Sequence, residues 1–547
     1  MPGMIRILLP LLLAATPSPP PDATTTVRGL VNTKDQAFSG HKHFDGGIYT
    51  PKINGVPVET TAVVSLFVNP TGSDTANCTD VSTPCATING ARAKLPNHLR
   101  HNATITLAAG TYTLTSSQLI DGLTMTDGVS LTIQGSTTWT QWTPASGTAT
   151  GALTGFTALA FPTRAIFTDS TQTWPAASTW AAAGLGIRGR FVCMTSGIQS
   201  GNKFPISAAS PTTLEVSRTS FTGGNPATGN TYEICTPSTI LTGAVSGLIK
   251  IGTGTGTVNL NDLSFEPSAP NISALSMGAT GGRQGGFLVA LNRIRARTFP
   301  TGGGTGITLT TNGNYGVTVT DSAIIATTAN EGGNDSTAIT AGSNQGALGA
   351  ARFTFTDVYV RGMRTALAAA HSLVVVNGLT VDSENIASNV VVSLNKVEIT
   401  SFVNGWVNCY SGEGSSQSTQ SGVAMTGGGR ASVFSLQVKG CQIGVDLGNF
   451  GGTTQTPQST GSVFAFSGTT ARIDLVNIGQ SSPTTGAGIM LGGSTPVNLK
   501  GGTVTLTTVA NGARDYVCPD LTTAFTEAAV QADGDKYVEC QGASVQR

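Results

Sequence analysis

The chain has 547 residues, 70 of them glycine, and only 11% are charged. Its 29 basic and 29 acidic residues cancel to a formal charge of zero, and the sequence has no basic stripe of the kind that neutralises phosphates, which argues against nucleic acid as a partner. This low charge, with 39% hydrophobic residues, also excludes a largely disordered chain. The length allows a large core and two or three domains.

Residues 1–21 predict an apolar leader or anchor peptide. Arg6 precedes an apolar run, Ile7 to Ala15, and small residues and proline follow it. This order is typical of a secretory signal with Leu13 to Ala15 as the cleavage site, although Pro10 interrupts the run. Two interpretations stay open: a signal that is removed, or an apolar peptide that inserts into a larger assembly. No other run is long and apolar enough to cross a bilayer, so we expect no membrane span.

Residues 22–64 contain a short pattern of spaced residues. It reads Thr-Thr, Gly and Val within Thr24 to Val31, then Gln-x-Phe-x-Gly-x-Lys-x-Phe at Gln36 to Phe44. The pattern resembles a module of bacteriophage tail fibres and tail spikes, where such segments lie upstream of the receptor-binding region and belong to trimers. The resemblance implies a homotrimer that attaches to a tail or baseplate through its N-terminus. A segment this short cannot bury its apolar residues alone, which also favours packing against sister chains.

His41 and His43 lie within this segment. A His-x-His strand places both imidazoles on one face, so three chains around an axis could offer six nitrogens to a metal. Histidines exposed on a strand, without a metal, are the interpretation we adopt. We expect neither a metal nor a cofactor in this protein.

Residues 65–154 predict the entry to a repeated fold. A strand ends at a turn after Val68, and Ile88, Ala91 and Leu95 have helical spacing. Strands return at 103–107 and 129–133. This order resembles the first coils of many extracellular β-helix proteins and tail spikes. A helix there would cover strand edges that the end of a solenoid exposes.

Residues 155–238 interrupt the repeat and predict a small inserted β domain. Several antiparallel strands are expected, at 187–193, 213–216 and 232–235. A recognition surface and a simple spacer both remain open as the role of this domain.

Residues 239–508 repeat an eight-residue frame: apolar, any, apolar, polar, any, apolar, any, apolar. The clearest copy is Val374 to Val381. The apolar places alternate on each side of the polar place, so each copy predicts two short strands and a bend. We expect the polar residue to form the bend, because asparagine tolerates the left-handed region. The polar places that should stack in one column include Asn261, Asn292, Asn377 and Asn395.

These polar places recur about 18 to 44 residues apart, which is typical of a solenoid. The sequence resembles the pectate-lyase-like β-helix superfamily, in which asparagine stacks at the bend between two sheets. The resemblance covers roughly residues 240–508 and implies an all-β, right-handed parallel β-helix. Residues 509–547 leave the coil pattern, which predicts an end cap that covers the last coil. An antiparallel sandwich is the alternative, but it would not need the same polar bend in every coil.

The eight cysteines fall into four neighbouring couples. Sequence alone permits 105 pairings, but the spacing lacks the Cys-x-x-Cys of zinc sites. Disulfides would imply an oxidising, extracellular setting, whereas a virion protein folds in a reducing cytoplasm; this tension stays open. The couples are Cys78 with Cys85, Cys193 with Cys235, Cys409 with Cys441, and Cys518 with Cys540.

The seventh place of each frame should point outward and form a ladder on the surface. That expectation brings carboxylates together with aromatic rings, as a polysaccharide groove requires: acids protonate a glycosidic oxygen or activate water, and rings stack on sugars. Solvated acids on an exposed face are the plainer alternative. The candidate catalytic residues are Glu398, Asp382 and Glu384, and the candidate sugar-binding residues are Tyr359, Trp406 and Tyr410.

Three functions follow from these patterns. The first is a trimeric protein resembling a phage tail spike or tail fibre, which recognises a host surface polysaccharide with or without cleaving it. The second is a secreted bacterial β-helix enzyme, a polysaccharide lyase or hydrolase. The third is a structural or adhesive surface protein without catalysis. The Arg-x-Pro-x-x-Arg strand and the calcium-binding aspartates of pectate lyases are missing from the sequence, so the resemblance carries no reaction with it.

Overall fold

The computed structural model describes residues 52–540, with gaps. The longer gaps are 144–147, 175–185, 278–285, 299–304, 327–336, 344–350, 384–389, 410–420, 448–462, 467–470, 479–486, 491–496, 499–502, 508–513, 519–524 and 533–537. The described residues belong to one compact unit, Lys52–Arg547. The predicted leader, the tail-fibre-like residues 24–44, and His41 and His43 lie outside the described residues. Within them, no helix is long and apolar enough to cross a membrane.

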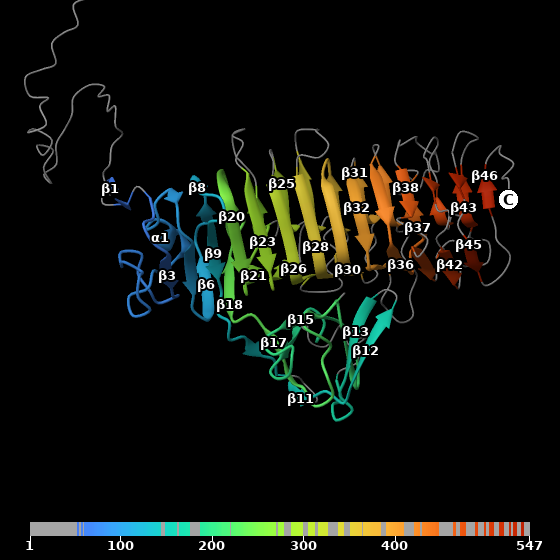
Figure 1. Cartoon of the computed structure of the whole chain (residues 1–547), viewed down its shortest axis with the longest axis horizontal. Helices are drawn as coiled ribbons and strands as arrows, with labels where there is room; N and C mark the ends of the chain where they lie inside the picture. The colour runs from blue at the N-terminus through green and yellow to red at the C-terminus, as the bar shows by residue number, and fades with distance from the viewer. Residues whose placement is uncertain are drawn as a thin grey trace, which may run out of the picture. The chain divides into compact units, whose positions relative to one another are not determined.

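The chain forms a parallel β-helix in which each coil contributes three strands (Figure 1). One coil consists of β20 (Gly254–Asn261), β21 (Ser264–Pro267) and β22 (Leu275–Met277). The next consists of β23 (Phe287–Asn292), β24 (Arg295–Thr298) and β25 (Thr305–Thr311), and each of its strands pairs in parallel with the corresponding strand before it. The predicted fold class is therefore confirmed.

In the middle coils the first two strands merge into one that runs through the bend. These long strands are β26 (Tyr315–Ala326), β28 (Ala351–Arg361) and β30 (Leu373–Asp382). The third strands of the same coils are β27 (Thr337–Ser343), β29 (Thr365–Ala370) and β31 (Val390–Asn395). The apolar places of the frame face inward: Val374, Val376, Leu379 and Val381 are at most 1% exposed. Burying each such side chain contributes about 1.5–3 kcal/mol.

The bend itself lies one residue later than the sequence predicts. The polar places Asn261, Asn292 and Asn377 lie in one column together with Thr320 and Thr356. The following residue takes the left-handed conformation instead. These fifth-place residues are Asp262, Arg293, Asp321, Asp357 and Asn404, with φ of 47° to 57°, and Gly378, with φ of 92°. Aspartate, asparagine and glycine accept this conformation most readily, and Arg293 is the unusual member.

The prediction that Asn395 belongs to this column is wrong. Asn395 ends β31, where it pairs with Ala370 and Thr426 in the third ladder, while Asn377 pairs with Val403. The apparent frame from Val392 to Ile399 is divided between two strands of different sheets. A pattern of four apolar places in eight residues also arises by chance. Residues 392–399 match the pattern without forming the two strands and the bend that it predicts.

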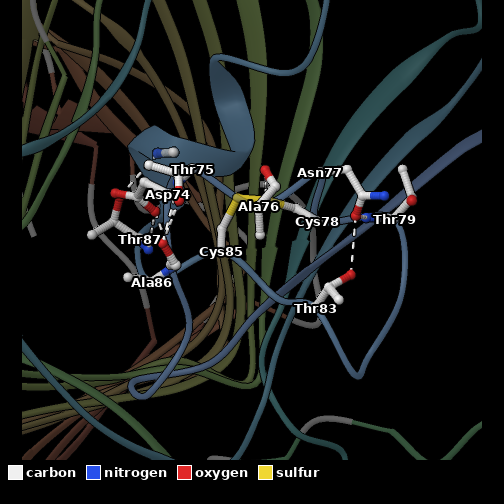
Figure 2. Close-up of a disulfide and its surroundings, with 12 residues drawn as sticks. Asp74, Thr75, Ala76, Asn77, Cys78, Thr79, Thr83, Cys85, Ala86 and Thr87 are labelled. Atoms are coloured by element: carbon white, nitrogen blue, oxygen red, sulfur yellow. Dashed lines mark hydrogen bonds between the residues drawn. A yellow bond between two sulfur atoms is a disulfide. The ribbon is translucent and has the colours of Figure 1, made fainter.

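The N-terminal coils begin with β3 (Val64–Val68), followed by β5 (Ala103–Leu107) and β9 (Ser130–Gln134), which pair in that order and lead into β20. The predicted helix is α1 (Ile88–Arg92), whose N-cap Thr87 accepts a hydrogen bond from the Gly90 amide at 2.9 Å. Figure 2 shows Asp74 accepting from the Ala86 and Thr87 amides beside the Cys78–Cys85 disulfide.

The inserted domain is antiparallel throughout. Its strands are β10 (Thr140–Gln141), β11 (Thr150–Ala152), β12 (Gly155–Ala160), β13 (Thr163–Thr168), β14 (Phe191–Met194), β15 (Lys203–Ser210), β16 (Thr213–Val216) and β17 (Thr231–Thr236). They enclose an apolar core of their own that includes Phe167, Trp174 and Phe204.

Three of the four cysteine couples form disulfides. Cys193 joins Cys235 between the paired strands β14 and β17 of the inserted domain, and Cys409 joins Cys441 on adjacent coils. Of Cys518 and Cys540 the structure describes the backbone, which pairs them in register between β43 (Arg514–Cys518) and β46 (Val538–Cys540).

The left-handed bend predicts a cost for substitution at Gly378. Gly378→Val puts a β-branched residue at φ of 92°, and we expect it to lower the free energy of unfolding by about 1–3 kcal/mol. The measurement is urea denaturation followed by circular dichroism. Val375→Thr, three residues earlier in β30, is the control and should stay near wild type; equal stability of both variants would contradict the assignment of the bend.

Candidate functional site

The inserted domain covers the face on which the sequence predicted a sugar groove. Seventh-place residues are buried instead of exposed: Ser264 is 1% exposed, Arg295 4% and Tyr359 0%. Tyr359 packs in a cluster with Phe191 of the inserted domain and Ala323. Tyr359 therefore cannot stack on a sugar in this structure, and its predicted binding role is corrected. The local pattern could not show this, because the covering strands come from more than 100 residues earlier in the chain.

Asp382, predicted as catalytic, forms a buried ion pair. Its side chain is 5% exposed and lies 2.7 Å from the guanidinium of Arg188, which comes from the inserted domain. Asn408 on the next coil donates a further hydrogen bond to it at 3.1 Å. A carboxylate enclosed in this way has no access to a glycosidic oxygen, so Asp382 holds two parts of the protein together.

Trp406 is half-buried, and its ring is occupied. The Arg164 guanidinium of the inserted domain lies 3.6 Å above the ring centre, a cation–π contact. This arrangement uses the ring face that a sugar would need. Glu384 and Tyr410 lie outside the described residues.

Glu398 lies far from Asp382 along the coil. Its backbone begins β32 (Glu398–Val403) and pairs with Leu373, at the start of β30, whereas Asp382 ends β30. The two arms of β30 on either side of the bend each span on the order of 15 Å. Glycosidases hold their two carboxyl groups roughly 5–9.5 Å apart. The predicted catalytic pair is therefore not brought together, although Glu398 itself lies on the part of the coil before the bend.

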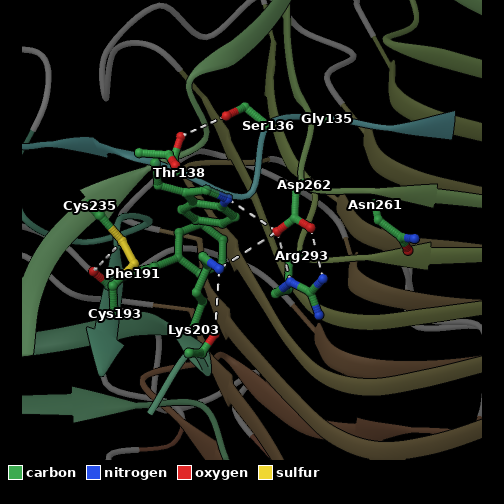
Figure 3. A network of polar contacts seen from close by, with 12 residues as sticks. Gly135, Ser136, Thr138, Phe191, Cys193, Lys203, Cys235, Asn261, Asp262 and Arg293 are labelled. Carbon is green, nitrogen blue, oxygen red and sulfur yellow. Dashed lines mark hydrogen bonds and ion pairs between the residues drawn. A yellow bond between two sulfur atoms is a disulfide. The ribbon is translucent and has the colours of Figure 1, made fainter. Parts of the chain in front are cut away.

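The fifth-place residues of successive coils form a second column at the bend, here called the bend column. Its charged side chains contact the inserted domain (Figure 3). Asp262 is 1% exposed and accepts two hydrogen bonds from Arg293, both at 2.8 Å. Gln134 and the Trp139 indole also donate to it, at 2.8 and 3.1 Å, and the Lys203 ammonium lies 4.0 Å away. Burial alone would raise the pKa of the Asp262 carboxyl, but these partners, Arg293 above all, outweigh it and hold that pKa below its ordinary value.

The same column continues with two more acids. Arg218 of the inserted domain lies 2.5 Å from Asp321 and 3.1 Å from Asp357, so one guanidinium bridges two adjacent coils. Burial raises the pKa of Asp321, and the charge of Arg218 opposes that shift. Left-handed residues thus point their carboxylates outward, and the inserted domain supplies the matching cations.

A second charged cluster lies just past the bend. Glu266 accepts hydrogen bonds from Arg295 and Arg297, each at 3.0 Å, and the Arg295 side chain also donates to the Gly189 carbonyl of the inserted domain at 3.3 Å. Burial, together with the charges of Arg295 and Arg297, lowers the pKa of Arg190 to about 9. Most charged groups on the covered face are therefore engaged in holding the inserted domain.

The face before the bend remains open. Here the place that precedes each frame points outward, and Leu288 is 57% exposed there. A shallow hollow of about 310 Å³ opens on this face because Gly316, next to Leu288 in the register, has no side chain. The residues that line it are Thr257, Leu288, Val289, Ala290, Gly316, Val317, Thr318, Arg352 and Thr354.

The chemistry of the hollow suits binding better than proton transfer. Three threonines bring hydroxyls, Leu288 brings an apolar surface, and Arg352 brings a cation; none of the lining residues is an acid. Among the described residues, no group of histidine, cysteine and carboxylate side chains could hold a metal. The seventh place of the frame, from which the predicted groove was derived, lies on the other face and gives no sign of this surface. The signal was present one residue before the frame, where Leu288 and Arg352 occupy an outward position.

No family model matches the chain, and no curated protein matches it. Among solved structures it is similar to the GH136 lacto-N-biosidase from Eubacterium ramulus, with 9% identity over 86% of this chain and 67% of that one and a TM-score of 0.37. It is also similar to XylC in complex with xylose, with 10% identity over 86% of this chain and 86% of that one and a TM-score of 0.26. A third similar structure is the tailspike of Acinetobacter baumannii bacteriophage AP22 in complex with a capsular saccharide, with 8% identity over 77% of this chain and 72% of that one and a TM-score of 0.16. At such identities and scores these likenesses transfer no site and no activity.

A structural role for Asp382 predicts loss of stability on substitution. Asp382→Asn leaves the Arg188 guanidinium buried without its carboxylate, and we expect a loss of about 3 kcal/mol in the free energy of unfolding. Thermal unfolding measures it. The double variant Arg188→Met with Asp382→Leu should recover most of the loss. A fully stable Asp382→Asn protein that had lost a polysaccharide-cleaving activity would contradict this role.

The ion pair at Asp262 predicts a dependence on pH. Because the folded-state pKa of Asp262 is depressed, its stabilisation is present above the unfolded pKa of about 3.9 and is lost as pH falls through the folded value. Asp262→Asn keeps a residue that accepts positive φ, and should be less stable than wild type by about 2 kcal/mol near pH 7. The difference in melting temperature should shrink below about pH 4. The exposed Asp127→Asn is the control; a difference that stayed constant with pH would refute the pair.

Proposed function

We propose that this protein recognises a polysaccharide along the open face of its β-helix. The observation that supports this is the hollow around Gly316, where hydroxyls, an apolar side chain and one cation meet on a surface that the inserted domain leaves uncovered. Sugars present hydroxyls for hydrogen bonding and apolar C–H faces for packing, and the hollow offers partners for both. Parallel coils extend the same surface over several rungs about 4.8 Å apart, which suits a polymer.

The fuller form of the proposal is a trimeric, tail-spike-like protein that recognises a host surface polysaccharide. The sequence resemblance at residues 24–44 supports it, and with it an attachment through the N-terminus. The three disulfides favour an oxidising, extracellular setting. Recognition without cleavage fits better than a lyase or hydrolase, because Asp382 is enclosed and lies far from Glu398.

Filling the hollow should weaken recognition. A Cβ atom at Gly316 would come within 2.8 Å of the Leu288 side chain, so Gly316→Val fills the space while suiting a strand. We expect the affinity for the bound polysaccharide, found by screening capsular and O-antigen polysaccharides, to fall about tenfold or more. Gly155→Val is the matched control, since its Cβ has room in β12 of the inserted domain.

Three outcomes would contradict parts of this proposal. Unchanged affinity in Gly316→Val would remove the hollow from the site. Reducing sugar or unsaturated product that disappears in Glu398→Gln would favour the enzyme instead. A monomeric mass by light scattering would contradict the trimer while leaving polysaccharide recognition in place.

A further inference from the structure

Two arginines on the open face differ from the others in the protein. Arg352 and Arg430 are exposed, and neither side chain makes a hydrogen bond or ion pair with any residue that the structure describes. The remaining arginines whose side chains are described each contact a carboxylate, a carbonyl, an aromatic ring or another group. Among the arginines whose side chains the structure describes, the two without a partner therefore lie on one face.

The strand register places both arginines in the same column. Arg352 pairs with Leu373, Leu373 with Glu398, and Glu398 with Arg430. Three strand spacings separate the two arginines, so their backbones lie about 14 Å apart. The hollow lies at one end of this interval, with Arg352 in its lining. The same column also contains Glu398, next to Arg430. Two cations at a fixed spacing in one register column match a ligand that carries negative charge at intervals.

From this arrangement we infer that the polysaccharide is anionic, and that Arg352 and Arg430 bind carboxylate, sulfate or phosphate groups on separate sugar units. The inference rests on the proposed function. A guanidinium forms paired hydrogen bonds with such oxyanions, whereas the threonine hydroxyls and Leu288 serve the uncharged part of the chain. None of the residues that line the hollow carries a negative charge to repel the ligand.

The test compares one polymer in two charge states. Full-length protein is titrated with polygalacturonate and with the same polymer after reduction of its carboxyl groups, and with a sulfated polysaccharide as a second anionic probe. We expect at least one anionic probe to bind about tenfold or more tighter than the neutral polymer, and its affinity to fall as salt is raised.

Variants then assign the effect to the two arginines. Arg352→Gln with Arg430→Gln should remove the preference for the anionic polymer, whereas Arg352→Lys with Arg430→Lys should keep part of it, since a point charge remains. Lys94→Gln with Lys250→Gln removes two positive charges elsewhere, from the end of the capping helix and from β19 (Ile249–Ile251), and serves as the control. Melting temperatures verify that all variants fold.

The outcomes separate this inference from the function on which it rests. Equal affinity for the charged and reduced polymers would overturn the inference and leave polysaccharide recognition standing. Binding to no polysaccharide in any charge state would count against both. A change in molecular mass in the double glutamine variant, without a change in binding, would overturn the inference and identify the face as a contact between copies of this chain.

Discussion

In six coils the chain turns between the first two strands through a single residue with positive φ, and that residue is aspartate, asparagine, glycine or, in one coil, arginine. The same geometry points that side chain outward and stacks it on its neighbours at the strand spacing of about 4.8 Å. Carboxylates repeated at that distance repel one another unless cations lie between them. Arg293 provides a cation within the column, next to Asp262, and Arg218 provides another for Asp321 and Asp357.

The charged column explains how the inserted domain is held. The domain makes an apolar contact with the coils in the cluster that contains Phe191 and Tyr359, and ion pairs and hydrogen bonds from Arg188, Arg218 and the Gly189 carbonyl also join it to them. Buried ion pairs contribute little net free energy to folding, but a buried charge that loses its partner destabilises the folded state strongly. We infer that the column acts chiefly by specifying position: a shift of the domain by one coil would move Arg218 away from its acids and Arg188 from Asp382.

Sequence reasoning succeeded where the signal is local and repeated. Inward places of the frame, the capping helix near Ile88 and three cysteine couples all depend on residues close together in the chain. Alternation with period two shows which side chains face inward, but it carries no information on φ, so the left-handed residue was placed at Asn261 instead of Asp262. The seventh-place ladder failed for another reason. Arg188 and Asp382 lie 194 residues apart, and no periodic pattern records which distant domain covers a face.

The two outer faces of the coil therefore have different electrostatic characters. On the covered face, acids and cations are matched within the protein, so that face offers no unpaired charge to a partner among the described groups. On the open face, the side chains of Arg352 and Arg430 have no partner among the groups that the structure describes. A single exposed arginine means little, because water satisfies it. Two in one register column are a different matter: a polymer held at the first is delivered to the second at high effective concentration, so weak contacts combine into useful affinity. In a solenoid, the repeat makes such two-point binding possible, because the spacing between coils fixes the distance between the binding groups.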